Sequence, residues 1–363
     1  MFPIPVSVIT GFLGAGKTTL LNRLLKDPDL KDAAVIINEF GEVAIDHLLV
    51  EKASDGIIEL SDGCLCCTVR GELVDTLADL VDRVQDGRIR NLSRVVVETT
   101  GLADPVPVLQ SIMGHPVLVQ AYRLDGVITL VDAVNGERTL EDHIEAVKQV
   151  AVADRLLVTK GDIRPDHRAL TAKLRALNPN AEILDISDPA AGLAALLACG
   201  LYDPVAKTAD VRRWLGEAAE HDHHDHDGHH HRHDHGNAGD HGVRSFSLVH
   251  DRPVPHAAIA TFLDLLQSTQ GDRLLRMKGI VELAEDPSRP LVLHGVQRIM
   301  HPPARLPAWQ DEKRGTRLVV IGADLSEDYV RRLFAAVTDT PMVDTPDRAA
   351  IAHNPLSIPG FSS

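Results

Sequence analysis

Short runs of β-branched and aliphatic residues alternate with amphipathic segments through the first half of the chain. The apolar runs are residues 6–10, 34–37, 94–97, 127–131 and 155–158. Apolar positions recur at helical spacing over residues 17–25 and 71–84. Continuous apolar runs are typical of strands buried on both faces, and helices between them form the crossovers of a parallel sheet. The pattern predicts an α/β domain with a mostly parallel sheet covered by helices.

The pattern breaks near residue 219 and resumes with a different order of elements. Residues 221–235 consist almost entirely of His and Asp, which have no apolar surface to bury, so disorder is expected. Beyond them, strands are predicted over residues 243–249, 278–283, 291–296 and 317–321, and helices over 256–266 and 326–337. The predicted organisation is a first domain at 1–218, a linker at 219–242, a small α+β domain at 243–339 and a tail at 340–363.

Composition and charge narrow the classes of partner. The 363 residues suffice for more than one core, and their net charge of −15 opposes binding to nucleic acid or to an anionic membrane. Only 3% of residues are aromatic, which disfavours stacking on single-stranded nucleic acid. Neither a bilayer-length apolar run nor a secretion signal is evident. A cytoplasmic protein without nucleic-acid or membrane partners is expected.

The segment GFLGAGKT at residues 11–18 follows a predicted strand and precedes a predicted helix. It fits the phosphate-loop pattern G-x-x-x-x-G-K-[ST], in which backbone N–H groups and a helix N-terminus surround phosphate oxygens. Lys17 is expected to reach the β- and γ-phosphates, and Thr18 to bind Mg²⁺. The predicted nucleotide-binding residues of this segment are Gly11, Gly14, Ala15, Gly16, Lys17, Thr18 and Thr19.

An acidic residue ends the apolar run at 94–97. Glu98 is followed by Thr99, Thr100 and Gly101. In nucleotide hydrolases of this type a carboxylate at that place holds Mg²⁺, and a glycine shortly after it contacts the γ-phosphate. Glu98 and Gly101 are therefore predicted to act with Lys17 in catalysis. A capping or ion-paired role is the alternative for Glu98.

A second polar cluster, TKGD, follows the run at 155–158. It fits the [NT]-K-x-D pattern of GTPases and contributes Thr159, Lys160 and Asp162 to the predicted base site. A carboxylate at Asp162 can accept two hydrogen bonds from guanine, a pair that adenine cannot supply. GTP and GDP are the predicted nucleotides, with ATP as the alternative.

Three of the four cysteines lie in the segment CLCC, between the two predicted phosphate-binding segments. Thiolates are preferred zinc donors, so Cys66 and Cys67, with Cys64, are predicted metal ligands. A redox switch and a plain structural use are the alternatives. The fourth, Cys199, lies in an apolar stretch and is expected to be a buried small side chain.

The histidines of the linker form a second group of candidate ligands, for borderline metals. They are His221, His223, His224, His226, His229, His230, His231, His233 and His235. They could concentrate metal near the cysteines, and the alternatives are a solvated spacer or a purification tag. The isolated His47, His115 and His294 are expected to be ordinary surface or loop residues.

Taken in order, these motifs resemble the CobW family of metal-associated GTPases. The resemblance rests on GFLGAGKTT, NEFGE at residues 38–42, GCLCC, ETTG, TKGD, the His-rich stretch, and GVQR at 295–298 and DEK at 311–313 in the second domain. It implies slow GTP hydrolysis with Mg²⁺, coupled to handling of zinc, cobalt, nickel or a related divalent ion and to delivery to a client protein.

The resemblance also suggests further metal ligands. Glu39 and Glu42, in a segment similar to the first switch loop, could complete the zinc shell or contact Mg²⁺. Some relatives carry a carboxylate where this chain has Ile37, which cannot coordinate a metal. Two other hypotheses stay open, a metal buffer with vestigial hydrolysis and a cobalt-handling factor in cobalamin synthesis. The client and the oligomeric state are not indicated.

Overall fold

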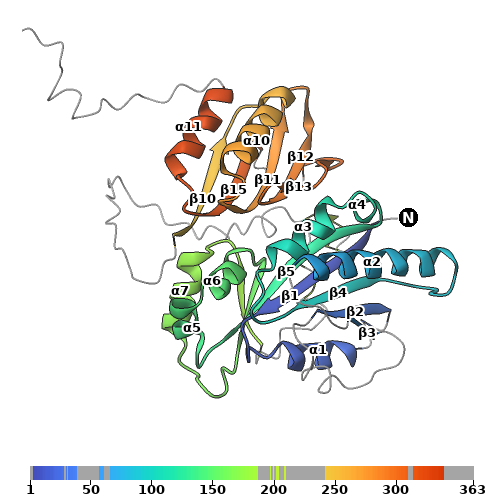
Figure 1. Cartoon of the computed structure of the whole chain (residues 1–363). Coiled ribbons are helices and arrows are strands. Elements are labelled where there is room, and N and C mark those ends of the chain that lie inside the picture. Colours follow the sequence, from blue (N-terminus) through green and yellow to red (C-terminus); the bar gives the residue numbers. More distant parts are fainter. Residues whose placement is uncertain are drawn as a thin grey trace, which may run out of the picture.

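The computed structural model contains two large β-sheets, one in each half of the chain (Figure 1). It describes residues 3–27, 30, 32–38, 57–60, 66–186, 197, 199, 202–203, 208–209, 242–309 and 314–338. Of these, residues 38, 57–60, 66–72, 202–203 and 208–209 are described by their backbone alone.

The first sheet has seven strands in the order β3-β2-β4-β1-β5-β6-β7, and each neighbouring pair is parallel. The strands are β1 (Ile4–Gly11), β2 (Ala33–Asn38), β3 (Ile57–Leu60), β4 (Arg94–Thr99), β5 (Tyr122–Asp132), β6 (Arg155–Thr159) and β7 (Glu182–Asp185). The predicted parallel sheet is confirmed. The predicted polar motifs begin at the carboxyl ends of its strands. Ligands usually bind at this edge of such a sheet.

Helices cover both faces of this sheet (Figure 1). They are α1 (Lys17–Leu25), α2 (Cys66–Gln85), α3 (Val106–Gly114), α4 (Leu118–Ala121), α5 (Gly136–Asp142), α6 (Ile144–Ala151) and α7 (Arg168–Leu177). Alternate residues of β1 belong to different cores: Val8 packs with α2, α3 and α6, whereas Ile9 packs with α1. This period of two explains why strands buried on both faces read as continuous apolar runs.

The second sheet is antiparallel, with the order β10-β15-β11-β12-β13 and with β14 paired to β12. Its strands are β10 (Val243–His250), β11 (Leu274–Leu283), β12 (Asp286–Val296), β13 (Ile299–Met300), β14 (Ala304–Arg305) and β15 (Thr316–Ala323). Its helices are α10 (His256–Gln270) and α11 (Glu327–Val337), the latter capped by Ser326, whose hydroxyl accepts a hydrogen bond from the Tyr329 N–H. A separate short hairpin joins β8 (Tyr202–Asp203) to β9 (Thr208–Ala209).

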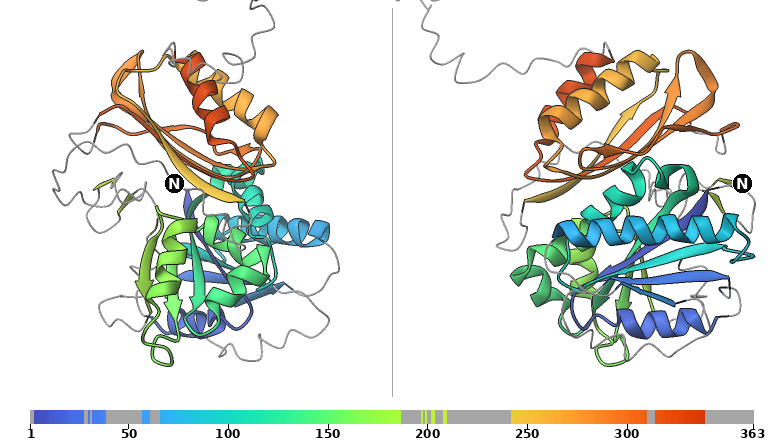
Figure 2. Two further views of the ribbon diagram at one scale, coloured as in Figure 1. Left: turned by 90° about the vertical axis from the view of Figure 1, so that its left-hand side faces the viewer. Right: turned by 45° about the vertical axis from the view of Figure 1, so that its right-hand side comes forward.

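The second sheet lies between its own helices and the first domain (Figure 2). Along β15, Leu318 and Val320 pack against α10 and α11, whereas Val319 and Ile321 belong to the core shared with the first domain. Both faces of this sheet are therefore used in folding. Any partner of the second domain must contact its helices, loops or edges rather than an open sheet face.

A buried ion cluster joins the two domains. Asp154, just before β6, accepts a hydrogen bond from Arg276 at 2.6 Å and forms a further ion pair with Lys278. Arg276 also donates to the Val152 carbonyl at the end of α6. Burial alone would raise the pKa of Asp154, but the two cations hold that pKa at about 2. The carboxylate is thus ionised and paired inside the domain contact.

One histidine departs from its expected place. His294 lies in β12, not in a loop, and its Nε2 is 3.2 Å from Nη2 of Arg276. Burial and the neighbouring cations depress its pKa well below the usual value, so the ring is neutral. An isolated histidine in a sequence gives no sign of a partner such as Arg276, which comes from the paired strand β11. His115 follows α3 as expected of a loop residue, and His47 lies outside the described residues.

A second contact between the domains involves α3. The side-chain amide of Gln110 donates to Oε1 of Gln297 at 2.9 Å, in the turn between β12 and β13. A Cβ atom on Gly114 would lie 2.8 Å from the Ile299 side chain, so the domains approach closely there. The boundaries proposed for the linker and the tail stay predictions, because residues 210–241 and 339–363 lie outside the described ones.

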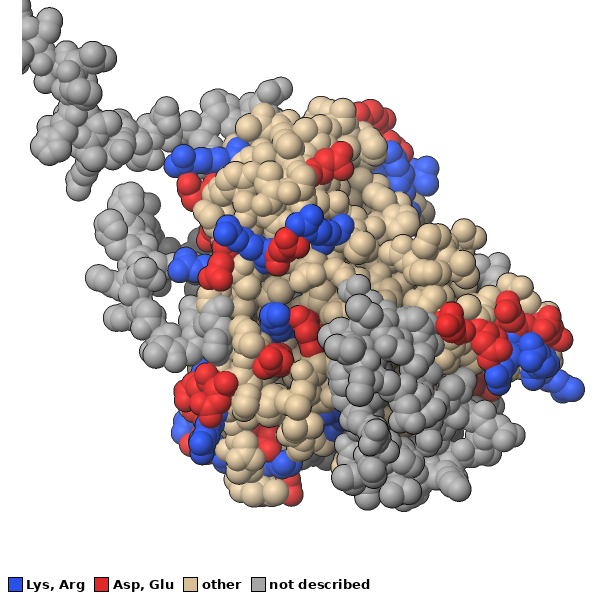
Figure 3. Space-filling view, viewed as in Figure 1, with Lys and Arg blue, Asp and Glu red and all other residues tan. Residues whose placement is uncertain are grey.

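Surface charge is mixed rather than segregated on the face shown in Figure 3. Acidic and basic side chains lie side by side over its described part. Within the described ranges, every helix is too short or too polar to cross a bilayer.

Replacement of Asp154 by Asn should weaken the domain contact strongly. The change leaves Arg276 and Lys278 without their buried counter-charge, so the free energy of unfolding should fall by about 3–5 kcal/mol. Because the folded-state pKa of Asp154 is lower than the usual 3.8, its stabilisation is present above pH 4 and is lost as pH falls towards about 2. Denaturant titrations at neutral and acid pH measure both effects.

Asp86 provides the control, since its carboxylate pairs with Arg88 at 2.9 Å on the surface. Asp86→Asn should change stability by no more than about 1 kcal/mol. Equal effects of the two substitutions would contradict the role given to the buried cluster.

Candidate nucleotide and metal site

The loop between β1 and α1 has the backbone of a phosphate loop. Gly14 and Gly16 have φ of 74° and 96°, which side chains on these residues would disfavour. A Cβ on Gly11 would lie 2.6 Å from the Leu130 carbonyl oxygen, so glycine is required there too. Lys17 begins α1, and its ammonium group donates to the Gly11 carbonyl at 2.9 Å. The loop therefore wraps around its own lysine beside a helix N-terminus.

The end of β4 lies directly against this loop. Glu98 is 2% exposed and pairs in register with Ile9 of β1 and Ile37 of β2. The next residue, Thr99, donates its hydroxyl to the Thr10 hydroxyl at 2.7 Å. Glu98 is thus fixed at the edge of the sheet where β1 enters the phosphate loop.

Gly101 touches the phosphate loop itself. A Cβ at this position would lie 2.7 Å from the Leu13 backbone nitrogen and 2.9 Å from its Cα. No side chain fits there without a shift of one of the two loops. The sequence predicted Gly101 near the phosphates, and the structure places its backbone against the loop predicted to hold them.

The TKGD segment supports the phosphate loop from a third strand. The hydroxyl of Thr159, at the end of β6, donates to the Ala15 carbonyl at 2.8 Å. Lys160 has φ of 59°, and its ammonium group pairs with Asp132 at 2.7 Å. Asp162 is exposed two residues further on.

Asp132 belongs to this site although the sequence did not predict it. Its carboxylate binds Lys160, the Asn135 amide and the Val134 N–H. Partial burial is the largest single influence and would raise its pKa, but these donors together lower it. Asp132 lies at the end of β5, which stands between β1 and β6 in the sheet. This position at the ligand edge is the signal that could have identified it.

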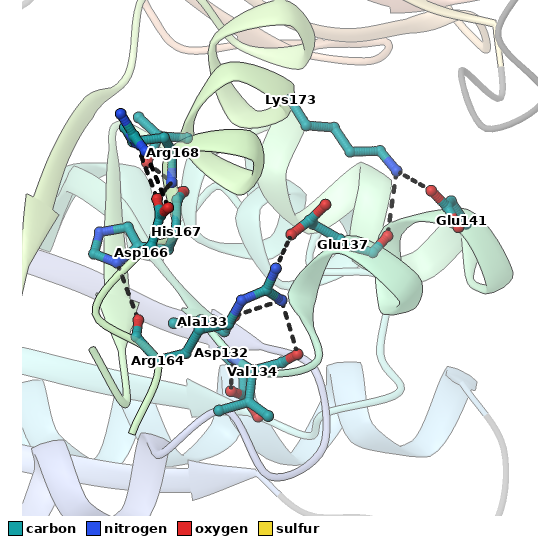
Figure 4. A network of polar contacts seen from close by, with 11 residues as sticks. Asp132, Ala133, Val134, Glu137, Glu141, Arg164, Asp166, His167, Arg168 and Lys173 are labelled. Carbon is teal, nitrogen blue, oxygen red and sulfur yellow. Dashed lines mark hydrogen bonds and ion pairs between the residues drawn. The ribbon is translucent and has the colours of Figure 1, made fainter. Parts of the chain in front are cut away.

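A network of ion pairs holds the loop after Lys160 in place (Figure 4). The guanidinium of Arg164 donates to the Ala133 and Val134 carbonyls and pairs with Glu137 at 2.9 Å. The same loop is braced internally, because Asp166 pairs with Arg168 at 3.0 Å. The predicted base-binding loop is therefore joined to the segment after β5.

The structure brings three predicted groups together. The phosphate loop is flanked by the β4 end with Glu98 and Gly101 on one side, and by Thr159 with Lys160 on the other. The residues fit bound Mg²⁺ in chemical type, because Thr18 and Glu98 supply oxygen donors beside the glycine-rich loop. This arrangement can hold a nucleoside triphosphate with its phosphates over the N-terminus of α1.

The structure gives only the backbone of two predicted zinc donors, Cys66 and Cys67. A loop was expected for the CLCC segment. The structure instead begins α2 at Cys66, so Cys66 and Cys67 form the start of a helix. Their side chains, Cys64, Glu39, Glu42 and the nine linker histidines lie outside what the structure describes. Among the described side chains, His, Cys, Asp and Glu form no cluster of three suited to a metal. The zinc site stays a prediction.

Ile37 and Cys199 both belong to the hydrophobic core that includes α1. Ile37 is 4% exposed and packs with Ile9 and the leucines of α1, so it serves the core. Cys199 is buried as expected, and burial raises the pKa of its thiol to about 12. A thiol held neutral in this way is a poor metal ligand.

Comparison with known proteins assigns the chain to a family. The model of the CobW/HypB/UreG nucleotide-binding domain matches residues 5–185, and that of the cobalamin synthesis protein CobW C-terminal domain matches residues 243–338. The chain belongs to the CobW family. Both halves match, which accounts for the two sheets in their observed order.

Several full-length relatives share this organisation. The chain is 35% identical to the zinc chaperone YjiA of Escherichia coli (strain K12), across 93% of this chain and 99% of that protein. It is 33% identical to the zinc chaperone CobW of a Sinorhizobium species, across 92% and 97%. The crystal structure of Zn(II)-bound YjiA GTPase from E. coli matches with a TM-score of 0.66 and 32% identity, across 93% of this chain and 99% of that one.

Proposed function

We propose that this protein is a GTP-hydrolysing zinc chaperone that passes its metal to a client metalloprotein. The contact between Gly101 and Leu13 carries the proposal, because it joins the nucleotide loop to the segment that follows β4. The CLCC segment lies between these two loops in sequence and leads into α2. The names of the full-length relatives support zinc as the metal.

The chemical roles follow from the positions of the residues. Lys17 would neutralise charge on the β- and γ-phosphates, and Thr18 with Glu98 would hold Mg²⁺. The Gly101 backbone N–H would bind the γ-phosphate, and Asp162 would bind guanine. A strong general base for the attacking water is not evident in the sequence, so we expect slow hydrolysis in the absence of metal or client.

Nucleotide and zinc would be coupled through the segments around the phosphates. Bound Mg²⁺ and GTP would add contacts to the loop after Glu98 and to the segment containing Glu39 and Glu42. Since Cys64, Cys66 and Cys67 lie between these segments in sequence, their geometry would follow the nucleotide state. Thermodynamic linkage then requires zinc to change the affinity for GTP by the factor by which GTP changes the affinity for zinc.

Replacement of Asp162 by Asn should change the base preference from guanine to xanthine. The variant loses a charged acceptor for the guanine amine, which should weaken GTP binding by about 10- to 100-fold. An Asn amide can instead donate to the xanthine carbonyl, so XTP should bind better than it does to the original protein. Equilibrium titration with both nucleotides measures the exchange.

Asp166→Asn is the matched control, because Asp166 lies in the same loop and forms an exposed ion pair with Arg168. It should leave both affinities within about twofold. Equal losses of GTP affinity in the two variants, or ATP bound as tightly as GTP by the original protein, would contradict the guanine assignment.

Zinc affinity should differ between the GDP state and the state with a non-hydrolysable GTP analogue. Competition with a chelator of known affinity measures this, with cobalt and nickel as parallel metals. We expect a 5- to 150-fold difference, the usual range of coupling between two sites. Equal zinc affinities in the two states would contradict the coupling.

The His-rich segment favours a second candidate, a metal buffer whose hydrolysis is vestigial. Deletion of residues 221–235 and the Cys66→Ala, Cys67→Ala double variant separate the two functions. The chaperone requires that the cysteine variant lose the nucleotide-sensitive zinc site. The buffer would be supported if the deletion removed nearly all zinc binding and the cysteine variant bound normally.

A further inference from the structure

Helix α6 and its flanking residues contact the phosphate loop, the loop after β4 and the second domain. His143, which precedes it, stacks on Phe12 of the phosphate loop with ring centroids 4.4 Å apart. At its other end, the Val152 carbonyl accepts a hydrogen bond from Arg276 of the second domain. The helix is therefore placed between the phosphate loop and the domain contact, and its middle faces the loop after β4.

Two consecutive residues in the last turns of α6 hold that loop. The side-chain amide of Gln149 donates to the carbonyls of Gly101 and Ala103, each at 3.1 Å. The neighbouring Lys148 pairs with Asp104 at 2.9 Å. One turn of α6 therefore contacts the segment after β4 from Gly101 to Asp104.

Gln149 is buried, so its side-chain amide requires hydrogen-bond partners within the protein. Its side chain is 1% exposed, and it lines a cavity behind the phosphate loop together with Phe12, Leu13 and Ala15. Its own backbone carbonyl accepts the Thr129 hydroxyl at 2.7 Å, which fixes the helix to β5. A buried amide is costly unless its hydrogen bonds are made. The amide nitrogen of Gln149 makes both of its bonds to one loop, whereas its Oε1 has no partner among the described residues.

We propose that Gln149 is a positioning residue for GTP hydrolysis, acting through the backbone of Gly101. The inference rests on the proposed role of Gly101 as the contact to the γ-phosphate. With its carbonyl and that of Ala103 both bound by Gln149, Gly101 stays against Leu13. The Gly101 N–H is then held in one direction before the nucleotide binds. Less conformational entropy is therefore lost when this N–H binds the γ-phosphate.

The decisive variant removes the two donors and retains the volume of the side chain. Gln149→Met leaves the Gly101 and Ala103 carbonyls unpaired without adding charge. We expect kcat for GTP to fall by about 10- to 100-fold, since small displacements of a positioning group have effects of this size. GDP affinity should stay within about twofold, because GDP has no γ-phosphate to meet Gly101.

Asn178→Leu is the matched control, because Asn178 follows α7 and its side chain holds the end of α6 from outside that helix. Asn178 is also 1% exposed, and its amide donates to the carbonyls of Val150, Ala151 and Ala153 at the end of α6. Its loss should lower the melting temperature as much as Gln149→Met does, with kcat kept within about twofold. The pair separates positioning of the loop from general stability of α6.

A milder variant protects the test against misfolding. Gln149→Asn keeps the amide but shortens the side chain by one methylene, so it cannot reach both carbonyls and should also lower kcat. Unchanged kcat in a folded Gln149 variant, or an equal loss of kcat in Asn178→Leu, would overturn the inference.

Gly101→Ala in the same assays separates the role of Gln149 from the role of Gly101 on which it rests. If kcat is unchanged by Gly101→Ala, the role of Gly101 fails, and that of Gln149 fails with it. If Gly101→Ala is impaired and both Gln149 variants are not, the inference alone is overturned. Loss of kcat in Gly101→Ala and in the Gln149 variants, with GDP binding retained by the latter, supports both.

Discussion

The close approach of Gly101 to the backbone of Leu13 is the constraint on which the nucleotide half of this molecule depends. It requires a glycine after β4 and brings two loops of the parallel sheet into contact. The surrounding interactions maintain this contact: Thr159 holds the phosphate loop from β6, and Gln149 holds the segment after β4. A change at either loop must therefore be accommodated by the other, as a nucleotide switch requires.

The fold was largely predictable because its signals are local. Buried parallel strands produce continuous apolar runs, and the glycine-rich loop marks the first strand-to-helix turn, so the central strands and α1 were predicted from residues a few positions apart. The short strands β3, β13 and β14 lacked such a signal. The packing of the second sheet was also not predictable, because the outer face of β15 is buried by a domain distant in sequence.

The site was predictable where motifs carry it and not where distant residues complete it. Lys17, Thr159 and Gly101 stand in recognisable segments, and the structure brings their loops together. Asp132 and Gln149 come from β5 and α6 without a motif of their own, and only the folded arrangement reveals their partners. The metal prediction depends on cysteine spacing and resemblance, and it is the part that solution measurements must establish.

The central claim is that zinc exchange responds to the chemical state of the nucleotide. A single-turnover experiment tests it most directly: the zinc-loaded protein is mixed with GTP and Mg²⁺, and phosphate release and zinc transfer to a fluorescent chelator are recorded together. Coupling of zinc exchange to the nucleotide state predicts that the rate of zinc transfer changes with the time constant of phosphate release. A rate of zinc transfer that stays constant through the turnover would contradict it.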